Sequence, residues 1–156
     1  MPDIMGHKPS ERIERRMNFE LDPTLAADTL EFVSFELCDV RLMNDARFPW
    51  LILVPRRHAA VEILDLDRAD QDFLWSEIRF AAGVLRAVYR PDKLNIGALG
   101  NQVAQLHVHV IARFHGDAAW PAPVWGSGPA RRYEHERDKR LDELKAMLAE
   151  TRPSVR

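Results

Sequence analysis

Two histidines separated by one residue are the side chains best suited to do chemistry in this sequence. They lie in residues 105–111, which read QLHVHVI. In an extended strand the side chains alternate between two faces, and neighbours on one face lie roughly 7 Å apart. We therefore expect Gln105, His107 and His109 to form a polar row that can hold one ligand, while Leu106, Val108 and Val110 face the core.

Three interpretations fit this row. The histidines can be solvated side chains with no special task. They can chelate a metal, but the row offers no third ligand, so His58 or His115 would have to be brought near by the fold. Finally, one imidazole can act as a nucleophile beside the other, the arrangement needed to form and break a phosphoramidate bond. The spacing alone does not separate these interpretations.

The elements that would position the row read as a mixture of strands and helices. Strands are expected over residues 35–44, with one face exposed, over 51–54, with both faces covered, and over 93–98 and 105–114. Ile111 breaks the alternation of the last strand, which predicts either a bulge or burial on both sides. Residues 116–129, rich in Gly, Pro and Trp, read as an ordered loop.

The clearest helix is predicted over residues 68–89, where apolar residues recur every three or four positions. Asp67 is its expected N-cap, and Pro91 prevents its continuation. A charged peripheral helix is expected over 131–150, a short helix over 10–16 and a turn at Asp22-Pro23. Helices against an antiparallel sheet make an α+β domain.

Composition sets limits on the partners. The formal net charge is −2, so no overall basic field exists to hold a nucleic acid. Cys38 is the only cysteine, which excludes an internal disulfide and a cysteine-based zinc site. No apolar run resembles a signal peptide or approaches the roughly 20 residues of a membrane span. We expect a soluble, cytoplasmic protein without a membrane partner.

The stretch GNQVAQLHVHVIAR at residues 100–113 resembles the signature of the histidine triad (HIT) family, in which three histidines alternate with apolar residues. The resemblance extends over roughly residues 32–126. Asn44 follows a strand as in that family, residues 51–58 (LILVPRRH) resemble its apolar strand with basic residues after it, and Trp120-Pro121 and Trp125-Gly126 resemble a segment of its nucleoside-phosphoramidase branch.

Two positions depart from the family pattern. The first of the three motif positions is Gln105 instead of histidine. Trp50 stands before the apolar strand, where several family members carry a further histidine. The middle and last histidines of the motif are present as His107 and His109. The pair that the family's chemistry requires is therefore retained.

The resemblance implies a HIT-like fold with an antiparallel sheet of about five strands, and a homodimer. It divides the chain into an N-terminal extension (1–31), a HIT core (32–126) and a C-terminal helical segment (127–156). The implied activity is hydrolysis at the α-phosphate of a dinucleoside polyphosphate or a nucleoside phosphoramidate, through a nucleotidyl-histidine. Nucleotidyl transfer, or a nucleotide-binding or interaction module with little catalysis, remains the alternative.

The resemblance also assigns roles to single residues. His107 would attack through Nε2, with the proton on Nδ1 held by the backbone carbonyl of Gln105, and His109 would donate a hydrogen bond. Beyond the motif, Asn44 and Asn95 would contact the ribose and Asn101 and Gln102 the phosphate, while Trp120 and Trp125 would line the site or an interface. No metal or cofactor is expected. Arg56, Arg57 and His58 could steer phosphate, but a solvated role is the favoured interpretation for the two arginines.

Overall fold

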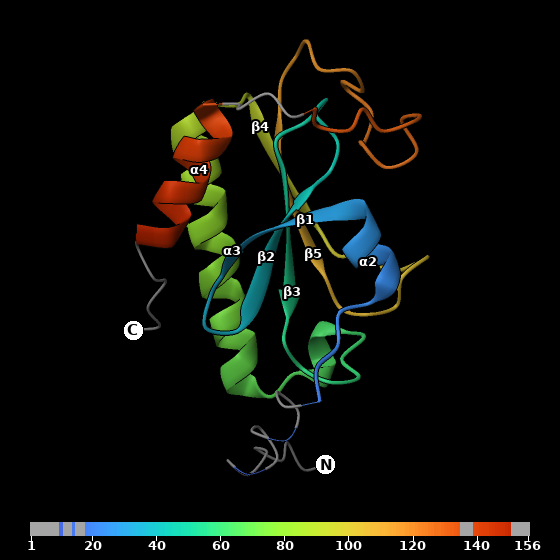
Figure 1. The fold of residues 1–156 in the computed structure, drawn as a ribbon, viewed down its shortest axis with the longest axis vertical. Helices are drawn as coiled ribbons and strands as arrows, with labels where there is room; N and C mark the ends of the chain where they lie inside the picture. The colour runs from blue at the N-terminus through green and yellow to red at the C-terminus, as the bar shows by residue number, and fades with distance from the viewer. Residues whose placement is uncertain (1–9, 11–13, 15–17, 135–138, 151–156) are drawn as a thin grey trace.

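The computed structural model describes residues 10, 14, 18–134 and 139–150. The strands form one antiparallel sheet in the order β1-β2-β3-β5-β4, with α3 and α4 on one face and α2 near the other (Figure 1). The α+β fold with a five-stranded antiparallel sheet is confirmed. The elements are α2 (Pro23–Asp28), β1 (Thr29–Ser34), β2 (Cys38–Met43), β3 (Trp50–Pro55), the 3-10 helix η1 (Ile63–Asp65), α3 (Arg68–Tyr89), β4 (Lys93–Gly97), β5 (Val108–Arg113) and α4 (Lys139–Glu150).

The long helix α3 begins and ends where the sequence predicts. The Asp67 side chain accepts a hydrogen bond from the backbone N–H of Asp70, as an N-cap does. At the other end, Arg90 adopts the left-handed conformation that closes many helices, and Pro91 follows. The apolar stripe of α3, which includes Leu74, Ile78 and Leu85, packs against the sheet.

The two central strands, β3 and β5, are buried along their whole length. Leu106, Val108 and Val110 lie in the core cluster between the sheet and α3, as the alternation predicts. Ile111 lies in a second cluster on the opposite face, with Leu25 of α2. The pairing of β3 with β5 shows no register shift, so the break in alternation reflects burial on both faces and not a bulge.

The N-terminal part of the domain contains two elements that the sequence analysis missed. Asp22-Pro23 is not a simple turn: Asp22 caps α2 through its carboxylate, and Pro23 occupies the first helical turn. The strand β1 follows directly and pairs with β2. This strand crosses the proposed boundary at residue 31. The division of the chain into 1–31, 32–126 and 127–156 stays a prediction.

The C-terminal helix does not begin at residue 131 as predicted, because residues 131–134 are not helical. The described helix, α4, covers Lys139–Glu150, and its buried Leu144 and Leu148 pack on the same core as α3. Residues 116–130 form the expected irregular loop, with a cis peptide bond between Trp120 and Pro121. Most of the helix predicted over residues 10–16 lies outside the described residues.

Arg56 and Arg57, which follow β3, are not solvated, contrary to the sequence-based interpretation, whereas His58 is exposed. Arg57 is buried and its guanidinium binds both carboxylate oxygens of Asp70, in the first turn of α3. Arg56 pairs with Asp39 and donates to the carbonyls of Phe35 and Glu36. Both arginines therefore tie the end of β3 to neighbouring elements, because a bidentate guanidinium holds fixed geometry.

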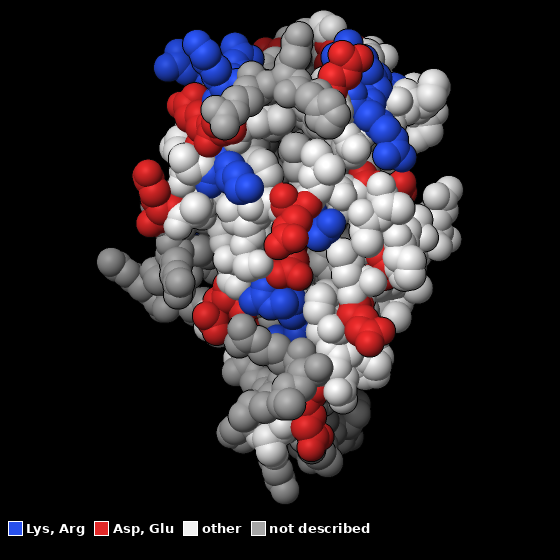
Figure 2. All heavy atoms as spheres, in the orientation of Figure 1, with Lys and Arg blue, Asp and Glu red and all other residues white. Residues whose placement is uncertain are grey.

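Acidic and basic side chains are interspersed over the face shown in Figure 2. This distribution agrees with the small net charge of −2. Among the described residues, no helix combines the length and apolar character needed to cross a membrane.

Candidate active site

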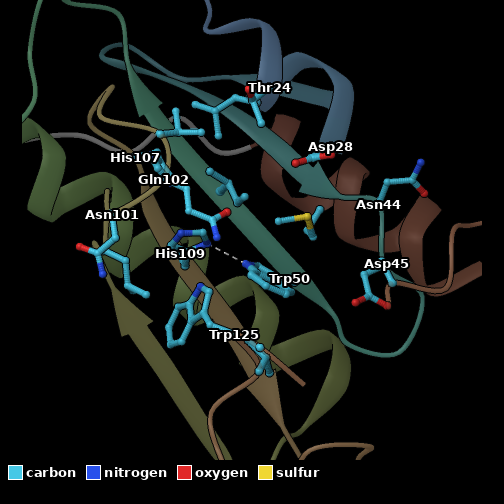
Figure 3. Close-up of a pocket in the computed structure, with 18 of the residues that line it drawn as sticks. Thr24, Asp28, Asn44, Asp45, Trp50, Asn101, Gln102, His107, His109 and Trp125 are labelled. Atoms are coloured by element: carbon cyan, nitrogen blue, oxygen red, sulfur yellow. Dashed lines mark hydrogen bonds between the residues drawn. The ribbon is translucent and has the colours of Figure 1, made fainter. Parts of the chain in front are cut away.

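A pocket of about 450 Å³ opens on the sheet face opposite α3. Its volume falls in the range of roughly 300–1,000 Å³ that is typical of small-molecule sites. Figure 3 shows Asn101 and Gln102 on the side of His107, with Asp28, Asn44 and Asp45 on the opposite side. The wall includes residues of five segments: Thr24, Leu25, Asp28, Met43, Asn44, Asp45, Arg47, Trp50, Ile52, Leu99, Asn101, Gln102, Val103, His107, His109, Val124, Trp125 and Arg132.

His107 enters the pocket immediately before β5. Its Nδ1 lies 2.6 Å from the backbone carbonyl oxygen of Gln105. A carbonyl oxygen can only accept a hydrogen bond, so the ring proton must be on Nδ1. In the neutral imidazole this leaves the lone pair on Nε2, which is the form required of a nucleophile.

His109 has the opposite tautomer. The indole Nε1–H of Trp50 donates to Nδ1 of His109 over 3.0 Å (Figure 3). Because an indole nitrogen only donates, Nδ1 must carry the lone pair, and the neutral ring must carry its proton on Nε2. Burial, helped by the nearby His107, lowers the pKa of His109 to about 3, so the ring is neutral at physiological pH.

The two imidazoles therefore offer complementary functions side by side. Their ring centroids are 4.8 Å apart and the rings are inclined by 70°. His107 presents a lone pair and His109 presents an N–H donor. Trp50 and Trp125 pack against His109 with centroid distances of 5.6 and 5.3 Å, and the ring is largely buried.

The depressed pKa of His109 predicts acid sensitivity of the fold. A histidine in the unfolded chain has a pKa of 6.5, whereas that of folded His109 is about 3. Between these values the unfolded state binds more protons than the folded state. The stability that neutral His109 contributes is therefore fully present above pH 6.5 and decreases as the pH falls toward 3. The maximum slope is ~1.4 kcal/mol per pH unit.

Urea unfolding at pH 7.5 and pH 5 tests this expectation. On acidification, the free energy of unfolding of the wild type should fall by about 2 kcal/mol more than that of a His109→Gln variant. The variant has no imidazole to protonate at this position. Equal losses in the two proteins would contradict the burial of a neutral ring.

Contrary to the predicted polar row, the side chain of Gln105 does not line the pocket, and it holds the segment before α2. Its Oε1 accepts a hydrogen bond from the backbone N–H of Asp22, and its Nε2 donates to the carbonyl of Glu20. The helix that follows supplies Thr24, Leu25 and Asp28 to the pocket wall. Gln105 thus serves the site twice, through its backbone carbonyl and through this link to α2.

Replacing Gln105 with Ala should affect substrate binding more than the chemical step. The carbonyl that orients His107 remains, whereas two hydrogen bonds to the wall segment are lost. A net hydrogen bond contributes about 0.5–1.5 kcal/mol, so we expect KM to rise by less than about tenfold, with kcat nearly unchanged. Steady-state kinetics measures both. A hundredfold loss of kcat, about 2.7 kcal/mol of barrier, would show that the amide acts in the reaction.

Three polar residues predicted from the sequence lie in the pocket wall: Asn44, Asn101 and Gln102. Asn44 lies directly after β2, and its Oδ1 accepts from the backbone N–H of Tyr133, which fixes the amide in place. Asn101 and Gln102 lie in the loop between β4 and β5, after Gly100, whose φ of 67° suits glycine. They reach the pocket from the side of the histidines (Figure 3).

Two other predicted site residues have different surroundings. Asn95 accepts a hydrogen bond from Arg113, which also binds Asp117 and the carbonyl of Ala122. Trp120 packs against Arg113 and against the ring of His115. Neither Asn95 nor Trp120 is among the residues that line the pocket. Both contact the buried Arg113, whose bonds to Asp117 and to the carbonyl of Ala122 anchor the loop after β5.

The sequence analysis missed several wall residues. Thr24, Leu25 and Asp28 come from α2, and an N-cap aspartate followed by proline is a signal that could have revealed this helix. Of the two tryptophans expected to line the site or an interface, Trp125 lies at the histidines, whereas Trp120 does not line the pocket. Trp50 was noted only as a departure from a family pattern, and its hydrogen bond to His109 is a contact between strands that no local spacing reveals.

The metal interpretation left open by the sequence requires a third ligand beside His107 and His109. Within the part of the chain that the structure describes, no group of three His, Cys, Asp or Glu side chains is arranged to hold an ion. His115 lies beside Asp92 and Trp120, not beside the pair at the pocket.

A five-stranded antiparallel sheet that presents a histidine pair to a pocket is the architecture of histidine triad proteins. The chain belongs to this family, because the HIT domain matches residues 25–116. Three similar crystal structures are histidine triad proteins. The proteins from Bradyrhizobium japonicum and Sinorhizobium meliloti are each 44% identical, with TM-scores of 0.78 and 0.79. That from Marinobacter aquaeolei is 43% identical, with a TM-score of 0.77.

These similarities cover nearly whole chains. The aligned parts comprise 84%, 86% and 83% of this chain and 96%, 98% and 93% of the three structures, in the same order. No curated protein matches the sequence significantly. Proteins of the HIT family are generally nucleotide hydrolases or transferases.

Proposed function

We propose that this protein is a nucleotide-binding hydrolase that acts at the α-phosphate of a dinucleoside polyphosphate or a nucleoside phosphoramidate. The observation that supports it is the pair of complementary tautomers in the pocket, with the lone pair on His107 and the N–H on His109. Asn101 and Gln102 lie on the histidine side, where a phosphate would bind. Leu25, Ile52 and Val124 provide an apolar wall for the nucleoside.

In the proposed reaction, Nε2 of His107 attacks the α-phosphorus and forms an N–P bond. The bond from phosphorus to the leaving group breaks, and its electron pair departs with that group. The Nε2–H of His109 donates to an oxygen on phosphorus, where negative charge increases. Water then attacks phosphorus and releases a proton to solvent. The N–P bond breaks, and its electron pair returns to Nε2 of His107, which regains its neutral form.

The nucleoside would bind across the pocket from the histidines. Asn44 is the proposed ribose contact, since its Oδ1 is held by Tyr133 and its Nδ2 has no partner among the described residues. A nucleoside monophosphate soaked into crystals would test this position directly.

A substrate screen tests the proposed function. Purified protein is incubated with adenosine and guanosine polyphosphates and phosphoramidates, and the released nucleotide is quantified, with a His107→Ala variant in parallel. Release of a nucleoside monophosphate by the wild type alone would support the proposal. Products formed with an added acceptor in place of water would indicate a nucleotidyl transferase. Tight binding of a nucleoside monophosphate without turnover of any compound would indicate a binding module.

We also propose a homodimer that forms along β4. This strand is at one edge of the sheet, so the outer side of its backbone has no strand partner in the described chain. Ile96 on β4 and Leu99 just after it are 47% and 42% exposed. A second copy pairing at this edge would continue the sheet and cover both side chains.

Light scattering of the wild type and of Ile96→Glu tests the dimer. The wild type should have twice the mass of one chain, and the variant should shift toward the monomer because it would bury a charge in the contact. A wild type that stays monomeric at high micromolar concentration would exclude the dimer.

A further inference from the structure

We propose that Trp50 is a positioning residue that locks His109 as a neutral Nε2–H donor, and that this makes the site selective for phosphoanhydrides over phosphoramidates. The leaving group of a phosphoanhydride departs as a stable anion, whereas that of a phosphoramidate must acquire a proton. The inference about substrate rests on the proposed function. The inference about Trp50 and His109 can be tested without it.

The lock follows from the hydrogen bond between the two rings. Trp50 Nε1 can only donate, and it lies 3.0 Å from Nδ1 of His109. An imidazolium carries protons on both nitrogens, so its Nδ1–H would face the N–H of Trp50. Protonating His109 would therefore break the bond and bring two donors together inside a buried site. The Nδ1–H tautomer of the neutral ring is disfavoured for the same reason.

Trp50 cannot easily move aside to relieve such a conflict. It is the first residue of β3, where it pairs with Ile111 of β5, while Ile52 pairs with His109. Trp50 and His109 are therefore diagonal neighbours on one face of adjacent strands. Trp50 is 5% exposed, and its ring packs edge-on against Phe48 and Trp125 with centroid distances of 6.4 and 6.2 Å.

Burial and the neighbouring His107 also favour the neutral form of His109, as the hydrogen bond from Trp50 does. His109 is also 5% exposed, and burial is the main cause that lowers its pKa to about 3. The nearby His107 lowers it further, since two cationic rings at this separation repel each other.

A neutral Nε2–H can stabilise charge but gives up its proton only with great difficulty. When His107 attacks a phosphoanhydride, the electron pair of the breaking P–O bond leaves on a phosphate oxygen, which is stable as an anion. The hydrogen bond from His109 is sufficient there. When the breaking bond is P–N, the nitrogen must bind a proton as it leaves, and no imidazolium is present at this position to supply it.

The kinetic experiment compares matched substrates that share one nucleoside and differ in the leaving group. A diadenosine polyphosphate and an adenosine phosphoramidate of an alkylamine are assayed with the wild type, Trp50→Phe and Trp50→His. Phe keeps an aromatic ring without the N–H donor, whereas the Nε2 of His lies at a similar distance from Cβ and can restore it. Trp120→Phe is the matched control, because Trp120 does not line the pocket.

The wild type should have the higher kcat/KM on the anhydride. In Trp50→Phe the ratio of anhydride to phosphoramidate kcat/KM should fall by about tenfold or more, because His109 loses the N–H that keeps a proton off its Nδ1. Trp50→His should restore the ratio in part, and Trp120→Phe should keep that of the wild type. An unchanged ratio in Trp50→Phe would overturn the proposed selectivity.

Nitrogen-15 NMR of the imidazole rings in the free protein provides a second readout that needs no turnover. In the wild type, His109 should show a protonated Nε2 and an unprotonated Nδ1 from pH 8 to pH 5, whereas in Trp50→Phe it should mix tautomers or titrate. A protonated Nδ1 in the wild type, or an unchanged spectrum in Trp50→Phe, would overturn the lock. If the spectra agree but no nucleotide derivative is cleaved, the proposed function and the selectivity fail while the role of Trp50 stands.

Discussion

Replacing His107 with Ala is expected to lower kcat/KM by at least about 10⁴-fold, roughly 5.5 kcal/mol of transition-state stabilisation. The reason is that Nε2 of this ring is the atom proposed to form the covalent bond, and the backbone carbonyl of Gln105 holds its proton on Nδ1. No other imidazole with this tautomer lines the pocket in the described chain. Initial rates on the best substrate of the screen would measure the loss.

The same variant should fold and bind. His107 is 7% exposed at the pocket surface, so its truncation leaves the sheet and the α3 core in place. We therefore expect a melting temperature within a few degrees of the wild type and retained binding of a nucleoside monophosphate. A folded His107→Ala protein that hydrolyses its substrate at more than about one hundredth of the wild-type rate, corresponding to less than 2.7 kcal/mol, would falsify the nucleophile assignment.

His109→Ala is expected to lower kcat by about 10²–10³-fold, the effect of removing one preorganised donor from a developing phosphate charge. The loss should appear in kcat more than in KM, because the hydrogen bond strengthens as charge increases on phosphorus oxygens. It should be smaller than that of His107→Ala, since the nucleophile remains. Single-turnover rates would separate the chemical step from product release.

His115→Ala is the matched control for this prediction. His115 is an exposed histidine beside Asp92 and Trp120, away from the pocket. Its removal should leave kcat and KM unchanged. If His109→Ala behaved like this control, His109 would be a packing residue and not a donor in the reaction.

The parts of the structure that the sequence predicted well are those with regular local patterns. The bounds of α3 follow from a long apolar stripe, an aspartate cap and a proline stop, all within one segment. The placement of Val108 and Val110 in the core and of His107 and His109 at the pocket agrees with the predicted alternation, although β5 begins only at Val108 and Gln105 does not line the pocket. Even Ile111, which breaks the pattern, was expected to be either bulged or doubly buried, and the second is observed.

What the sequence did not reveal depends on contacts between distant segments. Gln105 and Trp50 stood out as replacements of family histidines, yet their side-chain partners, Asp22 and His109, lie 83 and 59 positions away along the chain. The basic run after β3 appeared solvated because nothing local shows that Arg57 meets Asp70 across a turn. Similarly, Asn95 has the right residue type for a ribose contact, but its side-chain oxygen accepts a hydrogen bond from Arg113.

The most direct test of the account is to trap the covalent intermediate. Wild-type protein is mixed with substrate carrying a labelled α-phosphate, quenched in base, in which a phosphoramidate survives, and digested for peptide mass spectrometry. We predict one nucleotidyl group on His107, lost on acid treatment and absent from His107→Ala. Turnover with no nucleotidyl group on His107 at any quench time, or with the group on a different residue, would contradict the central claim.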